Sequence, residues 1–327
     1  MAKILIIQTA FIGDVILATS LVQFWQQHYP QDSIDFLLRK GNESLLAEHP
    51  HLRKIWIWDK KKQKYFQLRQ LLQQIRHEKY DIVFNAQRFG ATGFLTAFSG
   101  AKTKVGFRKN PFSIFFTHKL PHQYNAQTHE IDRLLSLAYA VSPFRTRNKP
   151  QIFPQQKDIA TLPPLPEKYI SIAPASVWFT KQYPPQAWTN FLKILPAEMP
   201  VLLLGGKEDY ELCHFIAENS QRTNTINLSG KINLRQSAVV MQRAQMNYVN
   251  DSAPLHLASA MNAPVRAIFC STIPDFGFTP LSDDGKVIQS TENLPCRPCG
   301  LHGYKACPKK HFRCADISPT QLLLPKK

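Results

Sequence analysis

Strand-like and helix-like segments alternate along the first half of the chain, and this alternation limits the folds open to it more than any other feature. Short apolar runs are separated by longer stretches in which apolar residues recur every three or four positions. The expected strands are 3–8, 34–38, 54–58, 81–85 and 104–107, and the expected helices are 14–27, 43–48, 67–77, 90–98 and 129–140. This order predicts a parallel sheet with helices on both faces.

A proline-rich stretch between residues 143 and 166 interrupts the alternation and is typical of a linker. Beyond it the alternation restarts. The expected strands lie within 168–176, 201–206, 225–230, 247–251 and 265–269, where the series closes, and the expected helices are 184–195, 210–219, 234–244 and 254–261. With 327 residues, the chain is long enough for two domains, which we place at 1–157 and 158–327. We expect an α/β fold of two Rossmann-like, doubly wound domains facing each other across a ligand-binding cleft.

Basic charge is concentrated in the first half. Residues 1–166 hold 23 Lys and Arg against 11 Asp and Glu, a net charge of +12. Residues 167–327 hold 17 against 12, a net charge of +5. Such a field attracts polyanions, although a functionally neutral basic surface is the plainer alternative. Motifs of nucleic-acid readers are missing from the sequence, so an anionic membrane or glycolipid is favoured over nucleic acid.

The sequence also indicates where the protein works. No run of 18 or more apolar residues occurs, so we expect no transmembrane helix. The N-terminal apolar stretch has the pattern of a buried strand rather than of a signal peptide. We therefore expect a cytoplasmic protein.

Asp14 stands at the junction of the first strand and the first helix, in the stretch "IIQTAFIGDVILATSL". It has two interpretations of similar weight. As a helix N-cap it would contribute about 1 kcal/mol. As a general base at the ligand-binding edge of the sheet, it would accept a proton from a bound hydroxyl. A dinucleotide site is disfavoured because G-x-G-x-x-G is missing from the sequence.

The second half offers several candidates for binding an anion. Asp251 and Ser252 precede a helix whose free N–H groups and dipole suit a phosphate, although an ordinary capped helix is equally compatible with them. His256, one turn further on, is more often structural than catalytic at such a position. Lys181 follows the first strand of this half and could neutralise a diphosphate, while "GGKED" places Glu208 and Asp209 where an acid can bind ribose hydroxyls.

Taken in order, these motifs carry a resemblance. "GDVILATSL", K-x-x-P-P-x-x-W, "GGKED", "NDSAPLHLASAMNAPVRAIF" and a four-cysteine tail resemble the ADP-heptose lipopolysaccharide heptosyltransferase family over nearly the whole chain. The resemblance implies a GT-B fold whose first domain binds the acceptor and whose second binds the nucleotide sugar. It further implies inverting, metal-independent transfer of heptose from ADP-heptose to the inner core, with no cofactor. The protein is then expected in the cytoplasm, at the inner face of the inner membrane.

The resemblance also assigns roles to residues. It implies that Asp14 is the general base and that Lys181 binds the diphosphate. Glu208, or Asp209 if the register slips by one, would bind the ribose. Asp251 and Ser252 would form the phosphate-binding loop, with His256 in the helix behind it. Two positions depart from the family pattern: Ala253 replaces a glycine and Ser20 replaces a proline.

An anionic glycolipid acceptor would meet basic residues near the predicted strand ends of the first domain. Arginine suits the carboxylates and phosphates of such an acceptor. The candidates are Arg39, Lys40, Arg88 and Arg108, followed by Lys109. The same basic domain is expected to associate with the membrane surface.

Four cysteines cluster near the end of the chain with the spacing C-x₂-C-x₇-C-x₆-C. Taken alone, this spacing is a moderate signal for a structural zinc site. Reduced thiols or a disulfide that packs the tail are the alternatives. The residues are Cys296, Cys299, Cys307 and Cys314.

Three other functions compete with the main interpretation. A GT-B transferase could use another nucleotide sugar or a glycoprotein acceptor. A GT-B fold without activity could bind anionic glycans. A zinc-dependent nucleic-acid binder is a more distant alternative, based on the charge and the cysteines.

Overall fold

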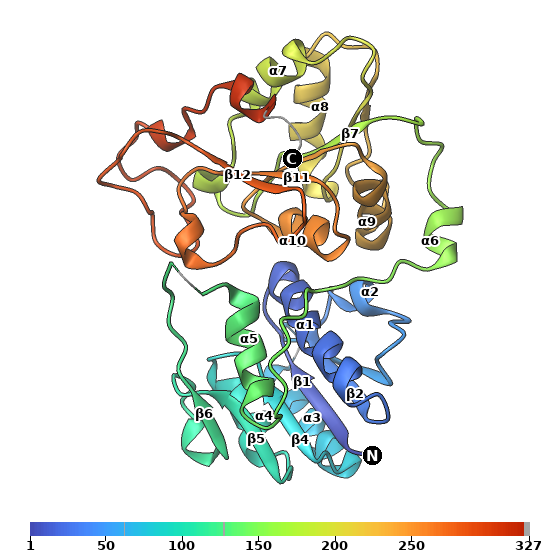
Figure 1. The fold of residues 1–327 in the computed structure, drawn as a ribbon, viewed down its shortest axis with the longest axis vertical. Coiled ribbons are helices and arrows are strands. Elements are labelled where there is room, and N and C mark those ends of the chain that lie inside the picture. Colours follow the sequence, from blue (N-terminus) through green and yellow to red (C-terminus); the bar gives the residue numbers. More distant parts are fainter. Residues whose placement is uncertain (62, 127, 324–327) are drawn as a thin grey trace. The chain divides into compact units, whose positions relative to one another are not determined.

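The structure is a computed structural model that describes residues 1–61, 63–126 and 128–323. The chain forms two compact units, Met1–Phe153 (unit 1) and Pro154–Lys327 (unit 2). The domain boundary expected between residues 157 and 158 falls inside a short helix of unit 2, α6 (Gln156–Ala160). Each unit contains one parallel sheet with helices packed on it (Figure 1).

Unit 1 contains a six-stranded parallel sheet in the order β3-β2-β1-β4-β5-β6. Its strands are β1 (Lys3–Ile7), β2 (Ser33–Arg39), β3 (Lys54–Trp58), β4 (Ile82–Asn85), β5 (Thr103–Phe107) and β6 (His118–Leu120). Its helices are α1 (Ile12–His28), α2 (Glu43–Leu46), α3 (Lys64–Glu78), α4 (Gly90–Phe98), α5 (Glu130–Tyr139) and the 3₁₀ turn η1 (Ser113–Phe115).

Unit 2 repeats this topology, with the strand order β12-β11-β10-β7-β8-β9. Its strands are β7 (Ile170–Ala173), β8 (Val201–Leu203), β9 (Thr225–Asn227), β10 (Asn247–Asn250), β11 (Val265–Phe269) and β12 (Gly285–Gln289). Besides α6, its helices are α7 (Pro185–Ile194), α8 (Tyr210–Asn219), α9 (Leu234–Arg243) and α10 (Ala253–Ala260). Short 3₁₀ turns lie at Phe179–Lys181, Lys207–Asp209, Pro274–Phe276, Arg313–Ala315 and Pro319–Leu323.

The predicted α/β class and the parallel sheets are confirmed, and the predicted strands and helices lie within a few residues of the observed ones. Apart from the 3₁₀ turns, two of the described strands and one α-helix were not predicted. β6 is three residues long, α6 lies inside the expected linker, and β12 follows the point where the series was expected to close. The prediction that the strands end at residue 269 was therefore wrong.

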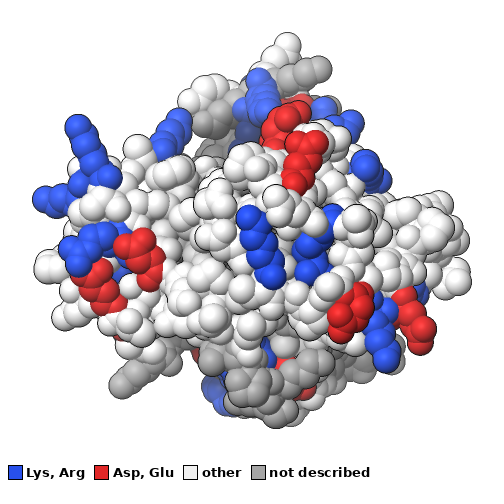
Figure 2. All heavy atoms as spheres, turned by 90° about the horizontal axis from the view of Figure 1, so that it is seen from above, with Lys and Arg blue, Asp and Glu red and all other residues white. Residues whose placement is uncertain are grey.

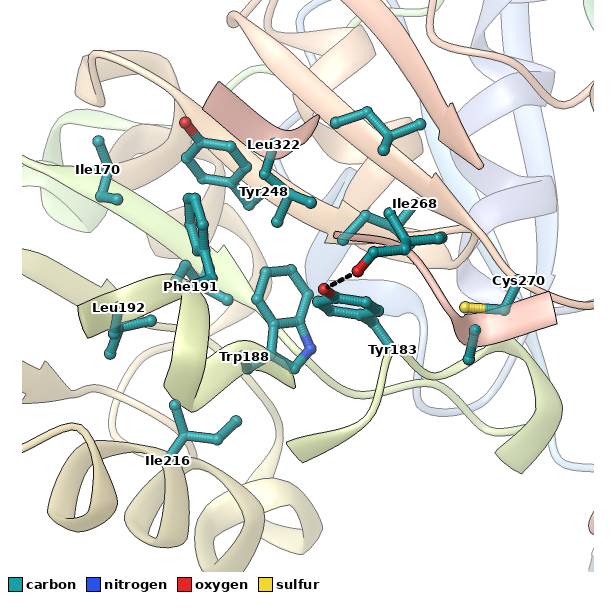
Figure 3. Close-up of a cluster of buried hydrophobic side chains, with 14 of the residues drawn as sticks. Ile170, Tyr183, Trp188, Phe191, Leu192, Ile216, Tyr248, Ile268, Cys270 and Leu322 are labelled. Atoms are coloured by element: carbon teal, nitrogen blue, oxygen red, sulfur yellow. Dashed lines mark hydrogen bonds between the residues drawn. The ribbon is translucent and has the colours of Figure 1, made fainter. Parts of the chain in front are cut away.

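The C-terminal segment of unit 2 packs against the hydrophobic core of that unit. Trp188 and Phe191 of α7 lie under the sheet with Tyr248 of β10, and all are buried (Figure 3). Tyr183 Oη donates to the carbonyl oxygen of Ile317 at 2.6 Å, which ties the tail to this core. Burial of such large aromatic side chains supplies much of the stabilising free energy of a domain of this size.

In each unit the strand order reverses once, between β1 and β4 in unit 1 and between β7 and β10 in unit 2. Open α/β sheets bind ligands at the carboxyl ends of the two strands on either side of such a reversal. The segments that follow these four strands are therefore where candidate functional residues are expected. No helix among the described residues has the length and apolar character needed to cross a membrane.

Candidate active site

Asp14 lies at the switch point of unit 1, in the first turn of α1. The chain leaves β1 at Ile7, and Phe11 occupies the N-cap position of the helix. Asp14 is the third residue of α1, and its Oδ2 accepts a hydrogen bond from the Phe11 N–H at 3.1 Å. The expectation that Asp14 could be the N-cap residue is therefore corrected. Its carboxylate accepts the N–H of the N-cap residue from inside the first turn, as the third helical residue does in a capping box.

The surroundings of Asp14 make its carboxylate more basic than usual. Burial raises the pKa of Asp14 to about 6, and the negative charge of Glu130 adds to the rise. The hydrogen bond from Phe11 and the positive charge of Arg39 act in the opposite direction but are weaker. A carboxylate with this pKa is ionised at neutral pH and close to the optimum for accepting a proton.

Glu130 belongs to a buried charged cluster that the sequence did not reveal. It is the first residue of α5, and its Oε2 accepts a hydrogen bond from Arg133 Nε at 2.7 Å. His122, just after β6, brings its Nε2 within 3.8 Å of Glu130 Oε1. Burial alone would raise the pKa of Glu130, but His122 and Arg133 outweigh burial and hold it below the usual value. Glu130 is therefore a fixed negative charge beside Asp14.

The predicted acceptor residues have different surroundings. Arg88, which follows β4, is half-buried and donates to Tyr124 Oη at 3.3 Å. Arg39, the last residue of β2, lies 5.0 Å from the centre of the Phe11 ring and influences the pKa of Asp14. Lys40 forms an ion pair with Asp59 at 3.0 Å. Arg108 is exposed just after β5. The contacts thus connect Arg39 and Arg88 with the surroundings of Asp14.

Lys181 and Asp251 meet at the switch point of unit 2. Lys181 ends the turn after β7, Asp251 follows β10, and Lys181 Nζ lies 2.7 Å from Asp251 Oδ2. Thr272 Oγ1 donates to the same oxygen at 2.6 Å. The side chains of Lys181 and Asp251 are 14% and 7% exposed, so the pair is largely desolvated. This geometry places a cation held by protein groups where the fold binds ligands.

Ser252 lies at the N-cap position of α10, but its side chain does not cap the helix. Its hydroxyl is 3.4 Å from the carbonyl oxygen of Ala175, to which it donates. The alternative of a helix capped by these side chains is therefore not borne out. Ser252 occupies the N-cap position but turns its hydroxyl toward Ala175, and Asp251 is held by Lys181. His256 is buried one turn further on, with its ring against Phe278.

Glu208 and Asp209 follow β8, and the structure separates their roles. Asp209 is half-buried and accepts a hydrogen bond from the Gly206 N–H at 2.8 Å. Glu208 is exposed and, among the described residues, its carboxylate takes part in no hydrogen bond or ion pair. Glu208 is therefore the acid of the two that is available to a ligand hydroxyl.

The cysteine-rich tail packs directly behind Lys181. The Tyr304 N–H donates to Thr180 Oγ1 at 2.8 Å, and Ser271 Oγ donates to the same oxygen at 2.9 Å. Gly303, with a φ of +77°, lies against this group. The tail thus supports the turn that carries Lys181.

The four clustered cysteines have free thiols. Cys314 is part of the core of unit 2, and Cys296 packs against that core with Phe312. Cys296 Sγ lies 3.7 Å from His311 Nε2. In the described part of the chain, no group of three or more His, Cys, Asp or Glu side chains is arranged to hold a metal ion. Cys314 and Cys296 therefore contribute to the packing of the tail.

The close approach of Gly303 gives a testable expectation. A Cβ at this position would lie 2.8 Å from Thr180 Oγ1 and 3.1 Å from Lys181 Cγ, in a left-handed backbone conformation. We expect Gly303→Ala to lower the free energy of unfolding by about 2–4 kcal/mol. Urea denaturation measures the change.

Gly300→Ala is the matched control. Gly300 also has a positive φ, of +64°, but the nearest atom to its Cβ would be Tyr304 Oη, at 3.5 Å. We expect this variant to lose only about 1 kcal/mol, from backbone strain. Equal losses in the two variants would contradict the close packing of Gly303 against Thr180 and Lys181.

The model of glycosyltransferase family 9 (heptosyltransferase) matches residues 68–305. Lipopolysaccharide heptosyltransferase 2 of Escherichia coli K12 is 24% identical over 355 residues, covering 98% of this chain and 96% of the relative.

Two solved structures show the same fold. E. coli ADP-heptose lps heptosyltransferase II matches with a TM-score of 0.78 and 23% identity, covering 98% of this chain and 96% of the other. The E. coli heptosyltransferase WaaC with ADP matches with a TM-score of 0.74 and 20% identity, covering 87% and 92%. The fold expected from the sequence, GT-B with two Rossmann-like domains, is confirmed.

Proposed function

Because the chain belongs to glycosyltransferase family 9, the heptosyltransferase family, we propose that it transfers heptose from ADP-heptose to the inner core of lipopolysaccharide. Two matches support this choice of donor and acceptor. One solved structure of similar fold contains ADP, and a relative similar over nearly the whole chain is named for lipopolysaccharide. The proposed transfer is inverting and needs neither a metal ion nor a cofactor.

In the proposed mechanism, Asp14 is the general base. The acceptor hydroxyl gives its proton to the Asp14 carboxylate while its oxygen attacks the anomeric carbon of the donor. The bond from the anomeric carbon to the diphosphate breaks as the new bond forms, so the configuration is inverted. The raised pKa of Asp14 supports this role, because a carboxylate with a pKa of about 6 accepts a proton more readily than an ordinary aspartate.

The leaving diphosphate gains negative charge, which Lys181 would neutralise together with Ser252 and the N-terminal end of α10. The observation that carries the proposal is the largely buried Lys181–Asp251 pair at the switch point of unit 2. The Asp251 carboxylate, 2.7 Å away, holds the Lys181 ammonium in place at the switch point, where it can turn toward an incoming anion. Glu208 is the proposed ligand of the ribose.

On the acceptor side, the proposal assigns Arg39 and Arg88 to the anionic groups of the inner core. The positive charge of Arg39 influences the pKa of Asp14, and Arg88 contacts Tyr124, whose pKa the Asp14 carboxylate helps to raise. A guanidinium binds carboxylates and phosphates with two parallel hydrogen bonds. Work on a lipid-linked acceptor would take place at the inner face of the inner membrane.

Nucleotide binding tests the proposed donor directly. We expect ADP, and not UDP, GDP or CDP, to raise the unfolding temperature of the protein without added metal. A ligand present at about one hundred times its Kd stabilises the native state by about 2.7 kcal/mol. Thermal unfolding with each nucleotide, in the presence of a chelator, is the measurement.

The outcomes of this experiment separate the alternatives. A rise in unfolding temperature with another nucleotide alone would be consistent with a glycosyltransferase that uses a different nucleotide-sugar donor. No shift with any nucleotide at millimolar concentration would contradict the proposed donor site and favour a module that binds glycans without transferring sugar.

A further inference from the structure

A surface of unit 1, built from α4 and η1, exposes large apolar side chains. Ile114 is 72% exposed, Phe89 63%, Phe115 49% and Phe98 38%. η1 contacts both α4 and β5, so these side chains belong to neighbouring elements. Figure 1 draws α4 beside the β4–β5 part of the sheet. We call these four residues the α4–η1 patch.

Two rings of the patch, Phe98 and Phe115, belong to a layer of phenylalanine rings that reaches the core. Phe98 lies 5.6 Å from Phe115 and 6.2 Å from Phe112, measured between ring centres. Phe94, 5.1 Å from Phe98, packs against the buried core of unit 1. The exposed rings are thus anchored from below. Large apolar side chains fixed at a surface in this way mark a place of interaction.

The chain around the patch is purely basic. Residues 82–129 contain no Asp or Glu, although they contain six Lys and Arg. Those close to the patch in sequence are Lys102, Lys104, Arg108, Lys109 and Lys119, and all but Lys104 are exposed. On the face of the molecule drawn in Figure 2, by contrast, basic and acidic side chains are interspersed. The α4–η1 patch therefore combines apolar side chains with nearby basic residues whose side chains form no ion pair within the described part of the chain.

This combination matches an anionic lipid surface. Phenylalanine and isoleucine enter the boundary between headgroups and acyl chains, while lysine and arginine stay at the phosphates. Single-stranded nucleic acid also binds aromatic and basic side chains, but it needs flat rings on which bases stack. The most exposed member here is the aliphatic Ile114, which offers no ring.

We propose that the α4–η1 patch docks this protein on the surface of an anionic lipid bilayer. Ile114, Phe115 and Phe98 enter the interface, and the surrounding lysines and arginines contact lipid phosphates. Phe89 is next to Arg88, which the proposed function assigns to the acceptor, so docking through this face would bring a lipid-linked acceptor to Arg88. That last step rests on the proposed function, whereas the lipid contact itself does not.

Vesicle flotation with the purified full chain tests the proposal. The vesicles contain equal parts of phosphatidylglycerol and phosphatidylcholine, or phosphatidylcholine alone. We expect binding to the anionic vesicles only, and a loss of about tenfold in affinity when salt rises from about 50 mM to about 500 mM.

Two patch variants separate the apolar from the basic contribution. Ile114→Ser combined with Phe115→Ser, and Lys102→Glu combined with Lys119→Glu, are each expected to weaken binding to anionic vesicles at least about tenfold. Matched controls in unit 2 are Phe215→Ser, where the phenylalanine is 41% exposed, and Lys193→Glu. The controls are expected to bind as the unaltered protein does.

Several results would overturn the proposal. One is equal binding of the patch variants and the controls to anionic vesicles. Another is that the patch variants lose self-association but not vesicle binding. A third is that vesicle binding weakens only after replacement of Tyr65 and Phe66, the exposed aromatic pair of α3. The ADP-induced shift is measured on the same samples. A retained rise in unfolding temperature with ADP shows that the variants fold. If the unaltered protein binds vesicles but ADP does not raise its unfolding temperature, the proposed donor is contradicted while the lipid-binding patch is supported.

Discussion

Replacing Asp14 by Asn is expected to reduce the turnover of heptose transfer at least about a hundredfold. The amide keeps the size and the shape of the carboxylate, and its oxygen can still accept the hydrogen bond from Phe11. It cannot accept the proton of the acceptor hydroxyl. Steady-state kinetics with ADP-heptose and a deacylated core acceptor measure the change.

The pH dependence of kcat/KM gives the same prediction a second readout. Asp14 acts in its ionised form, and its pKa is raised to about 6, first by burial and then by Glu130. We therefore expect kcat/KM to fall about tenfold per pH unit below pH 6. The residual activity of the Asn variant should show no such acid limb.

Stability distinguishes a lost base from a damaged fold. Because the native state holds a proton on Asp14 more tightly than the unfolded chain does, this group's contribution to stability decreases as the pH rises from about 4 to about 6. Above pH 6, Asp14→Asn should therefore unfold at the same temperature as the unaltered protein, or higher. A lower unfolding temperature that accounts for the lost turnover would count against the base role.

Asp132→Asn is a control in the same unit. Asp132 occupies the corresponding third position of α5, and its carboxylate accepts a hydrogen bond from the N-cap N–H of His129 at 3.2 Å. It also pairs with Arg147 at 2.6 Å, at the surface. This variant should lose up to about 1 kcal/mol of stability and keep its turnover within about threefold. Near-normal turnover of Asp14→Asn itself would rule out the proposed base.

The second large effect is expected at Lys181. Lys181→Met should lower turnover about a hundredfold or more and weaken ADP binding, because the leaving diphosphate loses a preorganised cation. The loss is larger than one contact suggests. The Asp251 carboxylate stays buried and repels the diphosphate, and among the described residues it keeps only the hydrogen bond from Thr272.

A double variant separates these two contributions. Lys181→Met combined with Asp251→Asn removes both charges, and it should bind ADP about fivefold more tightly than Lys181→Met alone. Calorimetric titration with ADP gives the affinities. Lys193→Met, an exposed lysine on α7, is the control and should bind as the unaltered protein does. Unchanged ADP affinity and turnover in Lys181→Met would exclude this lysine from the donor site.

The fold could be predicted from the sequence because apolar runs and helical periodicity are local properties. Most strands and helices follow directly from these patterns, and the parallel sheets follow from their order. The missing elements are those with weak local signals. β6 has only three residues, "HKL", and α6 is a short helix among prolines, where composition favours a linker. β12 follows a loop rather than a helix, so the alternation gave no reason to expect it.

The candidate site was predictable in position but not in its contacts. The sequence placed Asp14, Lys181 and Asp251 after strands, yet their partners depend on which strands are neighbours. Lys181 and Asp251 meet because β7 pairs with β10, although 70 residues separate them. Glu130 and His122 approach Asp14 through α5 and the unpredicted β6, so no spacing in the sequence could have revealed that cluster. A first-turn acid on α5 was the one local hint.

The Lys181–Asp251 pair also has a consequence for the design of inhibitors. In the free protein the lysine already has a counter-ion, so an incoming group must compete with a carboxylate 2.7 Å away. A neutral replacement for the diphosphate would separate the two desolvated charges without supplying a new ionic partner for Lys181. A doubly ionised group would instead attract the Lys181 ammonium. Inhibitors in which a neutral group replaces the diphosphate to improve membrane permeability should therefore bind more weakly. Permeability is better improved by changing the sugar or the base of the inhibitor.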